Sequence, residues 1–584
     1  MKFPFVLTFI LAACCAVAAQ KANVVSIEVE ADADFMYLPI SVSSKGVDLK
    51  ISKADGAVIF NEPVMLGAGK GDWYAPIDVS AYKNQKLTIS YAAGGLVGSP
   101  TILTSDRLFM RDFGADRGRP KFHIAATNGV LGASSGLFSF GGKYYAAVLQ
   151  NEKLTSRAGG FAPMLWESAD MGNWKAVDAP WLVKSRIKAP AGAFADIANR
   201  SGLFDGGGGG VVFACTDAQN KTFIAYSKDL KSIEYFNGGA PVLPGGGLWP
   251  QIFFNEHSRL WTLVRTESVD GKTARAAIYT SKDLAKWELA DTAFEEIGNF
   301  NANLARVDVL GAGSDAKWII LAGDGRYIVG DFDGKKFTRI TAKPLRIFTG
   351  SLNFLQLWSN APRGEVWATA TLMQPIPIIM HIKQHFINTL SLPWKLHLAR
   401  ADGGELQLRA SVADPFMRHL GVGADVIGGS MTFASNTFVV PGAYGNYCLY
   451  DGVFETTPNN TTAVILEVGV GAFGHAQGDS SYFLRRLAMD LETVKSPIKR
   501  RTAIIPFKAF VDSYSAEVVW YSGDIVQMLG DSFLNPEQTI KVGAVGELRI
   551  AKLDKYPVFV RKVSELRDAI IKIFRSDNKE KREK

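Results

Sequence analysis

Few groups of residues in this chain have the types and spacing that chemistry requires. Cys215 and Cys448 lie far apart and show no CxxC or metal-ligand spacing, which indicates two buried free thiols and leaves a disulfide open. The glycine run at residues 206–210 is followed by neither Lys-Ser/Thr nor a helical pattern. It is typical of a hairpin loop and not of a phosphate site. The sequence therefore indicates no metal and no cofactor.

Carboxylates are the remaining candidates, because two of them within about 5–10 Å can serve as general acid and as nucleophile or base. The acids that flank candidate strands are Asp112, Asp116, Glu152, Glu295 and Glu296. Each is typical of a solvated loop charge. A reactive pair would require two of them to converge in the fold, and the sequence leaves that alternative open.

The overall composition is that of an ordinary globular chain. Its 584 residues include 64 Lys+Arg and 57 Asp+Glu, a formal net charge of +7 that is too small to indicate nucleic acid as a partner. The length predicts two to four domains. High glycine content and short runs of Val, Ile, Thr, Tyr and Phe favour an all-β fold.

The N-terminus predicts export of a bacterial protein. Residues 1–19 combine Lys2, an apolar run at 3–11 and small residues, and the run is too short to span a membrane. Cleavage after the AVA string at 16–18 and a lipobox that would lipidate Cys14 both fit. The protein is thus expected in the periplasm, at the cell surface as a lipoprotein, or secreted, with a possible lipid anchor. No other run of 18 apolar residues predicts a transmembrane span.

The C-terminus has a different pattern. Apolar residues at helical spacing over 563–574 predict a short helix, and residues 575–584 are almost wholly charged or polar. A helix docked on a domain with a solvated tail fits this pattern, and a membrane-surface role for the basic helix is the alternative.

A strand–turn–strand unit recurs through the middle of the chain. Its turn aspartates are Asp170, Asp229, Asp283 and Asp333, at spacings of 59, 54 and 50 residues. Such an Asp can accept hydrogen bonds from the backbone N–H groups that follow it. Self-similarity at about 50 residues with β patterning predicts a β-propeller, and four visible units with a degenerate fifth predict five blades.

Flanking segments predict two further β domains. We expect a signal at 1–19, an N-terminal accessory β-sandwich at 20–110, the five-bladed propeller at 111–390, a C-terminal β-sandwich at 391–560, and a helix with a charged tail at 561–584.

Several strings, in this order, resemble glycoside hydrolase family 32, the family of invertases, inulinases and levanases. They are RPKFH at 119–123, DIANRSG at 196–202, SKDLAKW at 281–287, YIVGDFDG at 327–334, WSN at 358–360, LPWKL at 392–396 and FVDSYSAEV at 510–518. The resemblance implies a five-bladed propeller followed by a β-sandwich, and an activity on fructans or sucrose-like sugars. Residues 72–82 resemble an accessory sandwich attached to some bacterial members.

The same resemblance shows that all three acids of the family's active site are replaced. Ala133 stands where the family has its nucleophile, Trp249 where it has the Asp that holds the sugar hydroxyls, and Phe300 where it has the acid/base Glu. An alanine cannot attack an anomeric carbon and a phenylalanine cannot protonate a leaving group. The scaffold therefore predicts a glycosidase, whereas its residues favour an inactive relative.

Three hypotheses follow. The first is a non-catalytic protein that binds a fructan or another polysaccharide, with Ser135, Trp249, Phe300, Asn301 and Asn303 as candidate ligand-binding residues. The second is an active glycosidase of β-fructofuranosidase or levanase type with relocated acids or an altered substrate. The third is a structural surface protein whose propeller serves as an interaction platform.

Overall fold

The computed structural model describes residues 24–559 of the chain, apart from the gaps 93–97, 109–118, 154–159, 186–191, 207, 218, 271–272, 299, 312–314, 375–384, 402, 445–446, 458–460, 478–479, 487–488, 496–502, 532 and 534–538. The signal with Cys14, the C-terminal helix, Asp112 and Asp116 lie outside the described residues. Almost all of the described chain is β-strand, as the composition predicts. Among the described residues, no helix is long and apolar enough to cross a bilayer.

The chain divides into two compact units, the first up to Ser105 and the second from Asp106 onward. In the first unit, alternating buried and exposed positions along β5 and β6 are typical of strands with one face on a core. The unit has a four-stranded sheet of β1 (Val24–Glu30), β6 (Lys86–Ala92), β3 (Val47–Lys53) and β4 (Val58–Val64), and a three-stranded sheet of β5 (Trp73–Asp78), β2 (Phe35–Ile40) and β7 (Leu103–Ser105).

The second unit begins with four successive antiparallel sheets, each read from its innermost strand outward. They are β8 (Gly129–Phe140), β9 (Lys143–Asn151), β10 (Ala162–Ser168) and β11 (Lys175–Val177); β12 (Gly192–Asp196), β13 (Gly210–Thr216), β14 (Thr222–Ser227) and β15 (Glu234–Tyr235); β16 (Gly247–Asn255), β17 (Leu260–Ser268), β18 (Ala274–Ser281) and β19 (Glu288–Ala293); and β20 (Ala302–Asp308), β21 (Ala316–Ala322), β22 (Arg326–Phe332) and β23 (Phe337–Arg339), with β24 (Leu345–Arg346) on β22.

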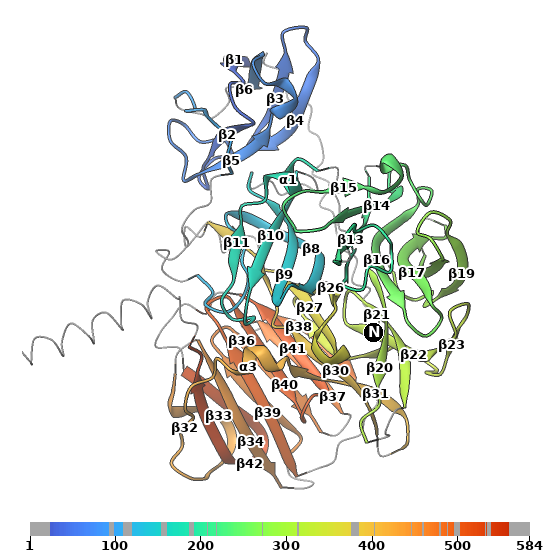
Figure 1. The fold of residues 1–584 in the computed structure, drawn as a ribbon. Helices are drawn as coiled ribbons and strands as arrows, with labels where there is room; N and C mark the ends of the chain where they lie inside the picture. The colour runs from blue at the N-terminus through green and yellow to red at the C-terminus, as the bar shows by residue number, and fades with distance from the viewer. Residues whose placement is uncertain are drawn as a thin grey trace, which may run out of the picture. The chain divides into compact units, whose positions relative to one another are not determined.

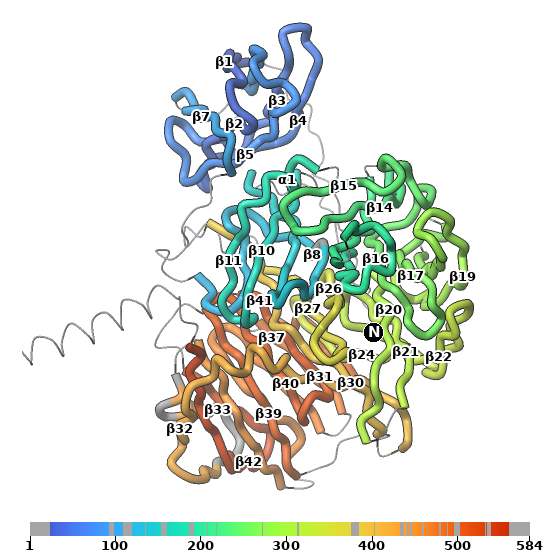
Figure 2. Tube along the Cα trace, viewed as in Figure 1, coloured from blue at the N-terminus to red at the C-terminus, as the bar shows by residue number. Residues whose placement is uncertain are grey.

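A fifth sheet completes a ring. It contains β26 (Leu352–Ser359), β27 (Val366–Leu372), β30 (Trp394–Arg400) and β31 (Leu406–Val412), and β26 pairs in parallel with β8 of the first sheet. Two short strands, β28 (Phe386–Ile387) and β29 (Thr389–Leu390), add to β8 and β27. Figure 1 and Figure 2 show the chain passing through the sheets in sequence, from cyan through green to yellow. The arrangement is the five-bladed propeller that the repeat predicts.

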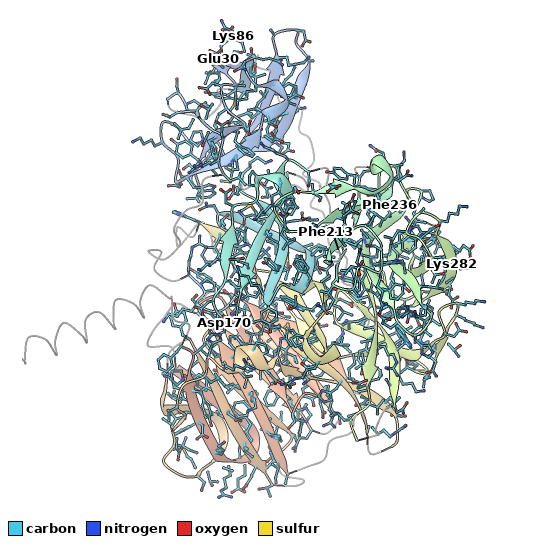
Figure 3. All side chains as sticks on the ribbon, viewed as in Figure 1. Glu30, Lys86, Asp170, Phe213, Phe236 and Lys282 are labelled. Carbon is cyan, nitrogen blue, oxygen red and sulfur yellow. The ribbon has the colours of Figure 1, made fainter. Side chains whose placement is uncertain are left out.

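The repeated turns behave as the sequence predicts. In the first sheet Asp170 Oδ1 accepts hydrogen bonds from the backbone N–H groups of Gly172 (3.0 Å) and Asn173 (2.8 Å). In the third, Asp283 Oδ1 accepts the N–H groups of Ala285 and Lys286, both at 2.9 Å. Figure 3 labels Asp170 of the first-sheet turn and, in the third-sheet turn, Lys282, which directly precedes Asp283. Each turn thereby satisfies its own backbone polar groups, so the outer hairpins close locally.

A β-sandwich follows within the same unit. Its strands are β25 (Phe348–Gly350), β41 (Ile525–Gly530), β40 (Ser515–Trp520), β39 (Ile504–Val511), β34 (Cys448–Thr456), β42 (Thr539–Pro557), β35 (Ala463–Val468), β36 (Gly471–Ala476), β37 (Ser481–Arg486) and β38 (Met489–Lys495), with β32 (Ala424–Asp425) and β33 (Met431–Tyr444) on β42. The short helices α1 (Pro180–Val183) and α3 (Asp414–Met417) and the 3-10 turns Ser80–Tyr82, Phe236–Gly239 and Pro362–Gly364 join strands. Cys215 and Cys448 are both buried, and neither forms a disulfide among the described residues.

A buried ionic cluster joins the propeller to the sandwich. His123 lies between two sandwich carboxylates, with Nδ1 2.9 Å from Asp512 and Nε2 2.7 Å from Glu517. Burial alone would lower the pKa of His123, but the hydrogen bonds and charges of the two carboxylates raise it to about 9. The imidazole is therefore a cation at neutral pH, held between two anions in the protein interior.

We predict that His123→Ala lowers the free energy of unfolding by about 3–5 kcal/mol, because it leaves two buried carboxylates without their counter-charge. Chemical denaturation of the full chain measures this loss. The matched control is His257→Ala, at an exposed histidine, which should leave the midpoint nearly unchanged. Equal midpoints for both variants would remove the cluster from the account of stability.

The same cluster predicts a pH dependence. Because the folded pKa of His123 is about 9 and lies above the ordinary value of 6.5, its contribution is complete below about pH 6.5 and is lost as pH rises through 9. We expect the difference in unfolding free energy between the wild type and His123→Gln to shrink from pH 7 to pH 10. A difference that stays constant across that range would contradict a charged His123.

Candidate functional site

The innermost propeller strands and the segments before them bring Ala133, Trp249 and Phe300, which the sequence predicts at the acid positions of the resembled family, to one end of the axis. Thr371 Oγ1 donates to the carbonyl of Gly132 at 2.9 Å, and Thr371 pairs with Asn353 in the fifth sheet. Ala133 therefore lies level with the start of β26. We call this end of the propeller, where the innermost strands begin, the entry end.

A second pair of contacts brings Phe300 and Trp249 to the same level. Thr266 Oγ1 donates to the carbonyl of Phe300 at 2.7 Å, and Thr266 pairs with Leu248 on β16. The side-chain amide of Asn301 donates to the carbonyl of Leu355 on β26 at 2.6 Å. Ala133, Trp249 and Phe300 thus gather at the entry end from the first, third and fourth sheets.

An aromatic pair spans the axis at the entry end. Trp249 and Phe354 come from the third and fifth sheets, which are not neighbours, and their ring centroids lie 6.0 Å apart at an interplanar angle of 62°. Both residues adopt left-handed backbone with φ 52°, and each lies at a register shift of its strand. A bulky side chain at positive φ costs about 1–3 kcal/mol and is commonest at functional sites.

Phe300 lies two residues before β20 of the fourth sheet and is partly exposed. The guanidinium carbon of Arg326 is 5.7 Å from the centre of its ring, a cation–π contact. Arg326 is in turn held by the carboxylate of Asp324 at 2.6 Å and by the carbonyl of Glu296 at 2.7 Å. Phe300 therefore presents a ring that is capped by a cation.

Asn301 and Asn303 have donors committed to the protein itself. Both side-chain amides donate to the carbonyl of Leu355, at 2.6 and 2.9 Å, and Asn303 also donates to Leu321 at 3.2 Å. These bonds tie the start of the fourth sheet to β26 of the neighbouring fifth sheet. The Oδ1 of Asn301 is buried and has no hydrogen-bond partner among the described residues. Sugar binding by these amides stays a prediction.

The first sheet contributes small residues at the entry end. Ala133 is buried, and the ring of Phe161 packs against Gly132. The buried hydroxyl of Ser134 has no hydrogen-bond partner within the described part of the chain. The side chain of Ser135, the remaining predicted ligand-binding residue, is not among the described side chains.

Glu152 is the acid nearest in the chain to this end of the first sheet. It follows Gln150, which pairs with Leu131 two residues before Ala133. Its Oε1 accepts hydrogen bonds from Thr127 Oγ1 and Gln150 Nε2, both at 2.7 Å. Burial raises the pKa of Glu152 to about 7, against the smaller opposing effect of these bonds.

The other candidate acids have different settings. Glu295 is exposed, and Glu296 forms an ion pair with Arg339 at 3.1 Å. Glu296 lies in the segment before β20, and Glu152 directly follows β9 of the first sheet. Glu296 is bound by Arg339 and Glu152 by Thr127, so the two acids have separate partners. In the described chain, no group of three or more His, Cys, Asp or Glu is placed to hold a metal ion.

We predict that Glu152 makes the fold less stable as pH rises from about 4.5 to 7. In that window the unfolded chain has released the carboxyl proton and the folded chain retains it, so folding takes up a proton. The unfolding free energy of the wild type minus that of Glu152→Gln should therefore fall over this window and stay level above it. Denaturation at several pH values measures the difference, and a flat profile would place the Glu152 carboxyl in an ordinary environment.

Comparison with known proteins finds the fold in solved structures. No family model matches the chain, and no curated protein matches its sequence. The exo-inulinase of Aspergillus awamori shares 16% identity with TM-score 0.63, over 76% of this chain and 99% of that one. A β-fructofuranosidase of Schwanniomyces occidentalis complexed with fructosyl-erythritol shares 16% with TM-score 0.61, over 76% and 99%.

A third structure carries the family name. The glycoside hydrolase family 32 β-fructofuranosidase of Bombyx mori shares 15% identity with TM-score 0.57, over 76% of this chain and 94% of that one. All three similarities are too remote in sequence to establish a shared activity. The similarity does cover nearly the whole length of each of the three solved structures. The chain therefore has the fold of glycoside hydrolase family 32 over about three quarters of its length.

Proposed function

We propose that this protein binds a fructan or a related polysaccharide at the entry end of its propeller and does not hydrolyse it. The observation that carries the proposal is the set of residues at the three acid positions, Ala133, Trp249 and Phe300. Carbohydrate handling agrees with the fold, because the similar solved structures are named as an exo-inulinase and two β-fructofuranosidases.

The chemistry of glycoside cleavage argues against turnover. A retaining enzyme needs two carboxyl groups about 5–5.5 Å apart, and an inverting enzyme needs them about 6.5–9.5 Å apart. The methyl group of Ala133 offers no nucleophile, the indole of Trp249 only an N–H donor, and the ring of Phe300 no proton. A sugar at this end would meet hydrogen-bond donors and aromatic faces instead of an acid pair.

The same residues favour binding. Trp249, Phe300 and Phe354 are each partly exposed, so their ring faces can stack on the apolar face of a sugar. The strained backbone of Trp249 and Phe354 fixes these rings before any ligand arrives, which lowers the entropic cost of binding. A rigid aromatic platform is suited to recognition without reaction.

Two alternatives each have an observation in their favour. An active glycosidase with relocated acids is favoured by Glu152, whose pKa of about 7 would keep a fraction of it protonated at neutral pH. A structural surface protein is favoured by the Trp249–Phe354 pair, which crosses the axis where a substrate would enter. For all three we propose export, to the periplasm, the cell surface through lipidated Cys14, or the medium.

We predict saturable binding of levan or inulin oligosaccharides by calorimetry and no release of reducing sugar. Trp249→Ala should weaken binding about tenfold, roughly 1.4 kcal/mol, because a stacking face is lost. The matched control is Trp287→Ala, a tryptophan at the outer turn of the third sheet, which should bind as the wild type does.

Reducing-sugar assays on the same samples separate the alternatives. Hydrolysis that disappears in Glu152→Gln would replace the binding proposal with a relocated mechanism. Neither binding nor hydrolysis across levan, inulin, sucrose and a plant glycan panel would leave the interaction platform as the function.

A further inference from the structure

A cavity of about 570 Å³ lies on the propeller axis away from the entry end. Its walls come from β12, β16, β20 and β26 and from the start of β27. On the innermost strands that carry Trp249 and Phe354, every lining residue follows those positions, from Gln251 on β16 and from Gln356 on β26. Ala133, Trp249 and Phe300 are not among its lining residues. We call it the exit cavity.

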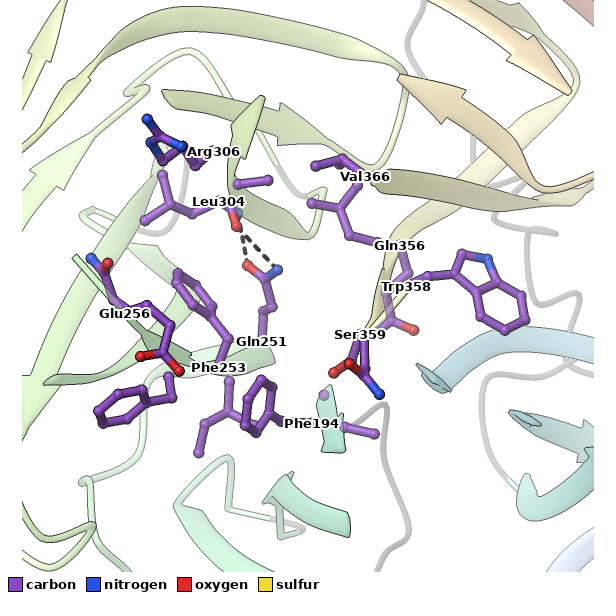
Figure 4. Close-up of a pocket in the computed structure, with 18 of the residues that line it drawn as sticks. Phe194, Gln251, Phe253, Glu256, Leu304, Arg306, Gln356, Trp358, Ser359 and Val366 are labelled. Atoms are coloured by element: carbon purple, nitrogen blue, oxygen red, sulfur yellow. Dashed lines mark hydrogen bonds between the residues drawn. The ribbon is translucent and has the colours of Figure 1, made fainter. Parts of the chain in front are cut away.

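Part of the exit cavity wall is fixed by one side chain. Gln251 Oε1 accepts the backbone N–H of Leu304 at 2.7 Å, and its Nε2 donates to the carbonyl of the same residue at 3.2 Å. Figure 4 shows this paired contact at the centre of the view. The contact joins β16 to β20 and engages both polar atoms of the Gln251 amide. Gln251 therefore stabilises the cavity wall and is not assigned to ligand binding.

The wall also presents aromatic surface. Phe194 and Phe253, both partly buried, line the cavity with Trp318, whose ring centroid lies 6.2 Å from that of Phe253. Figure 4 shows Phe194 and Phe253 on neighbouring strands at the cavity. A volume of this size with aromatic walls lies in the range of about 300–1,000 Å³ found for small-molecule sites.

One buried amide offers a hydrogen-bond donor to the cavity. Asn255 lines it and is only 3% exposed, and its Oδ1 accepts the N–H of His257 at 3.0 Å. Its Nδ2 has no hydrogen-bond partner among the described residues. A buried amide donor left unmade costs about 1–3 kcal/mol, which a ligand acceptor would recover.

Charge points the same way. Arg306 lines the cavity and is exposed, and within the described chain it forms no ion pair. Glu256, which directly follows β16 at the cavity, is already paired with two arginines at 3.0 Å each, Arg200 and Arg259. Glu365 is likewise paired with Lys395 at 2.6 Å. Both carboxylates of the lining therefore have a cationic partner, whereas Arg306 has no anionic partner among the described residues.

We propose that the exit cavity binds a small ring compound that carries a carboxylate, with the ring against Phe194 and Phe253 and the carboxylate toward Asn255 and Arg306. A carboxylate accepts hydrogen bonds without donating any, which matches the donors that Asn255 Nδ2 and the Arg306 guanidinium offer to the cavity. Sugar acids and aromatic acids share this chemistry. The site uses none of the residues of the proposed glycan site, so it stands or falls separately.

The experiment is calorimetric titration of the full exported chain with glucuronate, benzoate and glucose. We expect glucuronate or benzoate to bind saturably, and glucose, the matched neutral ring, to bind at least about tenfold more weakly. Whichever acid binds more tightly identifies the ring. No binding of either acid at about 10 mM, or equal binding of glucose, overturns the proposal.

Variants locate the site. Arg306→Gln should weaken binding of the acid about tenfold. Arg306→Lys should weaken it much less, because Lys restores the charge. Asn255→Asp keeps the acceptor for His257 and replaces the free donor with an anion, so it should also weaken binding. Trp249→Ala, at the entry end, should leave acid binding unchanged, and an unaltered affinity in Arg306→Gln would place the acid elsewhere. Thermal midpoints of all variants establish that they fold.

Discussion

The fold depends on a histidine cation held between two carboxylates in a dry interior. His123 precedes β8, and both carboxylates come from the sandwich. Asp512 also accepts the backbone N–H groups of Lys121 and Phe122, while Glu517 accepts Leu392 N–H at 2.9 Å and the indole of Trp394 at 2.7 Å. The sandwich thus binds the segment before β8 of the first sheet and the start of β30 of the fifth sheet. These are the two sheets that close the ring, because β8 pairs with β26.

This constraint explains how the fold can persist while the residues at the candidate site change. The charges of the His123 cluster are buried, so removing any one of them leaves the others without a counter-charge. A catalytic acid at the solvent-accessible entry end has no such role in folding. Ala133, Trp249 and Phe300 therefore fit a propeller that is otherwise complete. The ring of Trp249 packs against that of Phe354 on the fifth sheet.

Local signals in the sequence predict much of this structure and miss what is made across the axis. The Ser-x-Asp turns and the all-β propeller with its sandwich could be predicted because each depends on residues near in the chain or on a repeat. The fifth sheet lacks that turn and was inferred from the count alone. Phe354 was missed because nothing local marks it, and its importance comes from a partner two sheets away. The bonds of Asn301 and Asn303 to Leu355 on the neighbouring sheet were missed because the two sides of each bond lie more than fifty residues apart in the chain.

The propeller can carry different chemistry at its two ends because a fixed layer separates them. Between the entry end and the exit cavity, Gln251 bridges β16 to β20 through both polar atoms of its amide, and Gly192 lets β12 approach the backbone of Pro250 so closely that no side chain would fit. Side chains on either side of this layer can change without moving the strands. The aromatic entry end and the exit cavity are thus compatible on one axis, and a substitution at one end should leave binding at the other end unchanged.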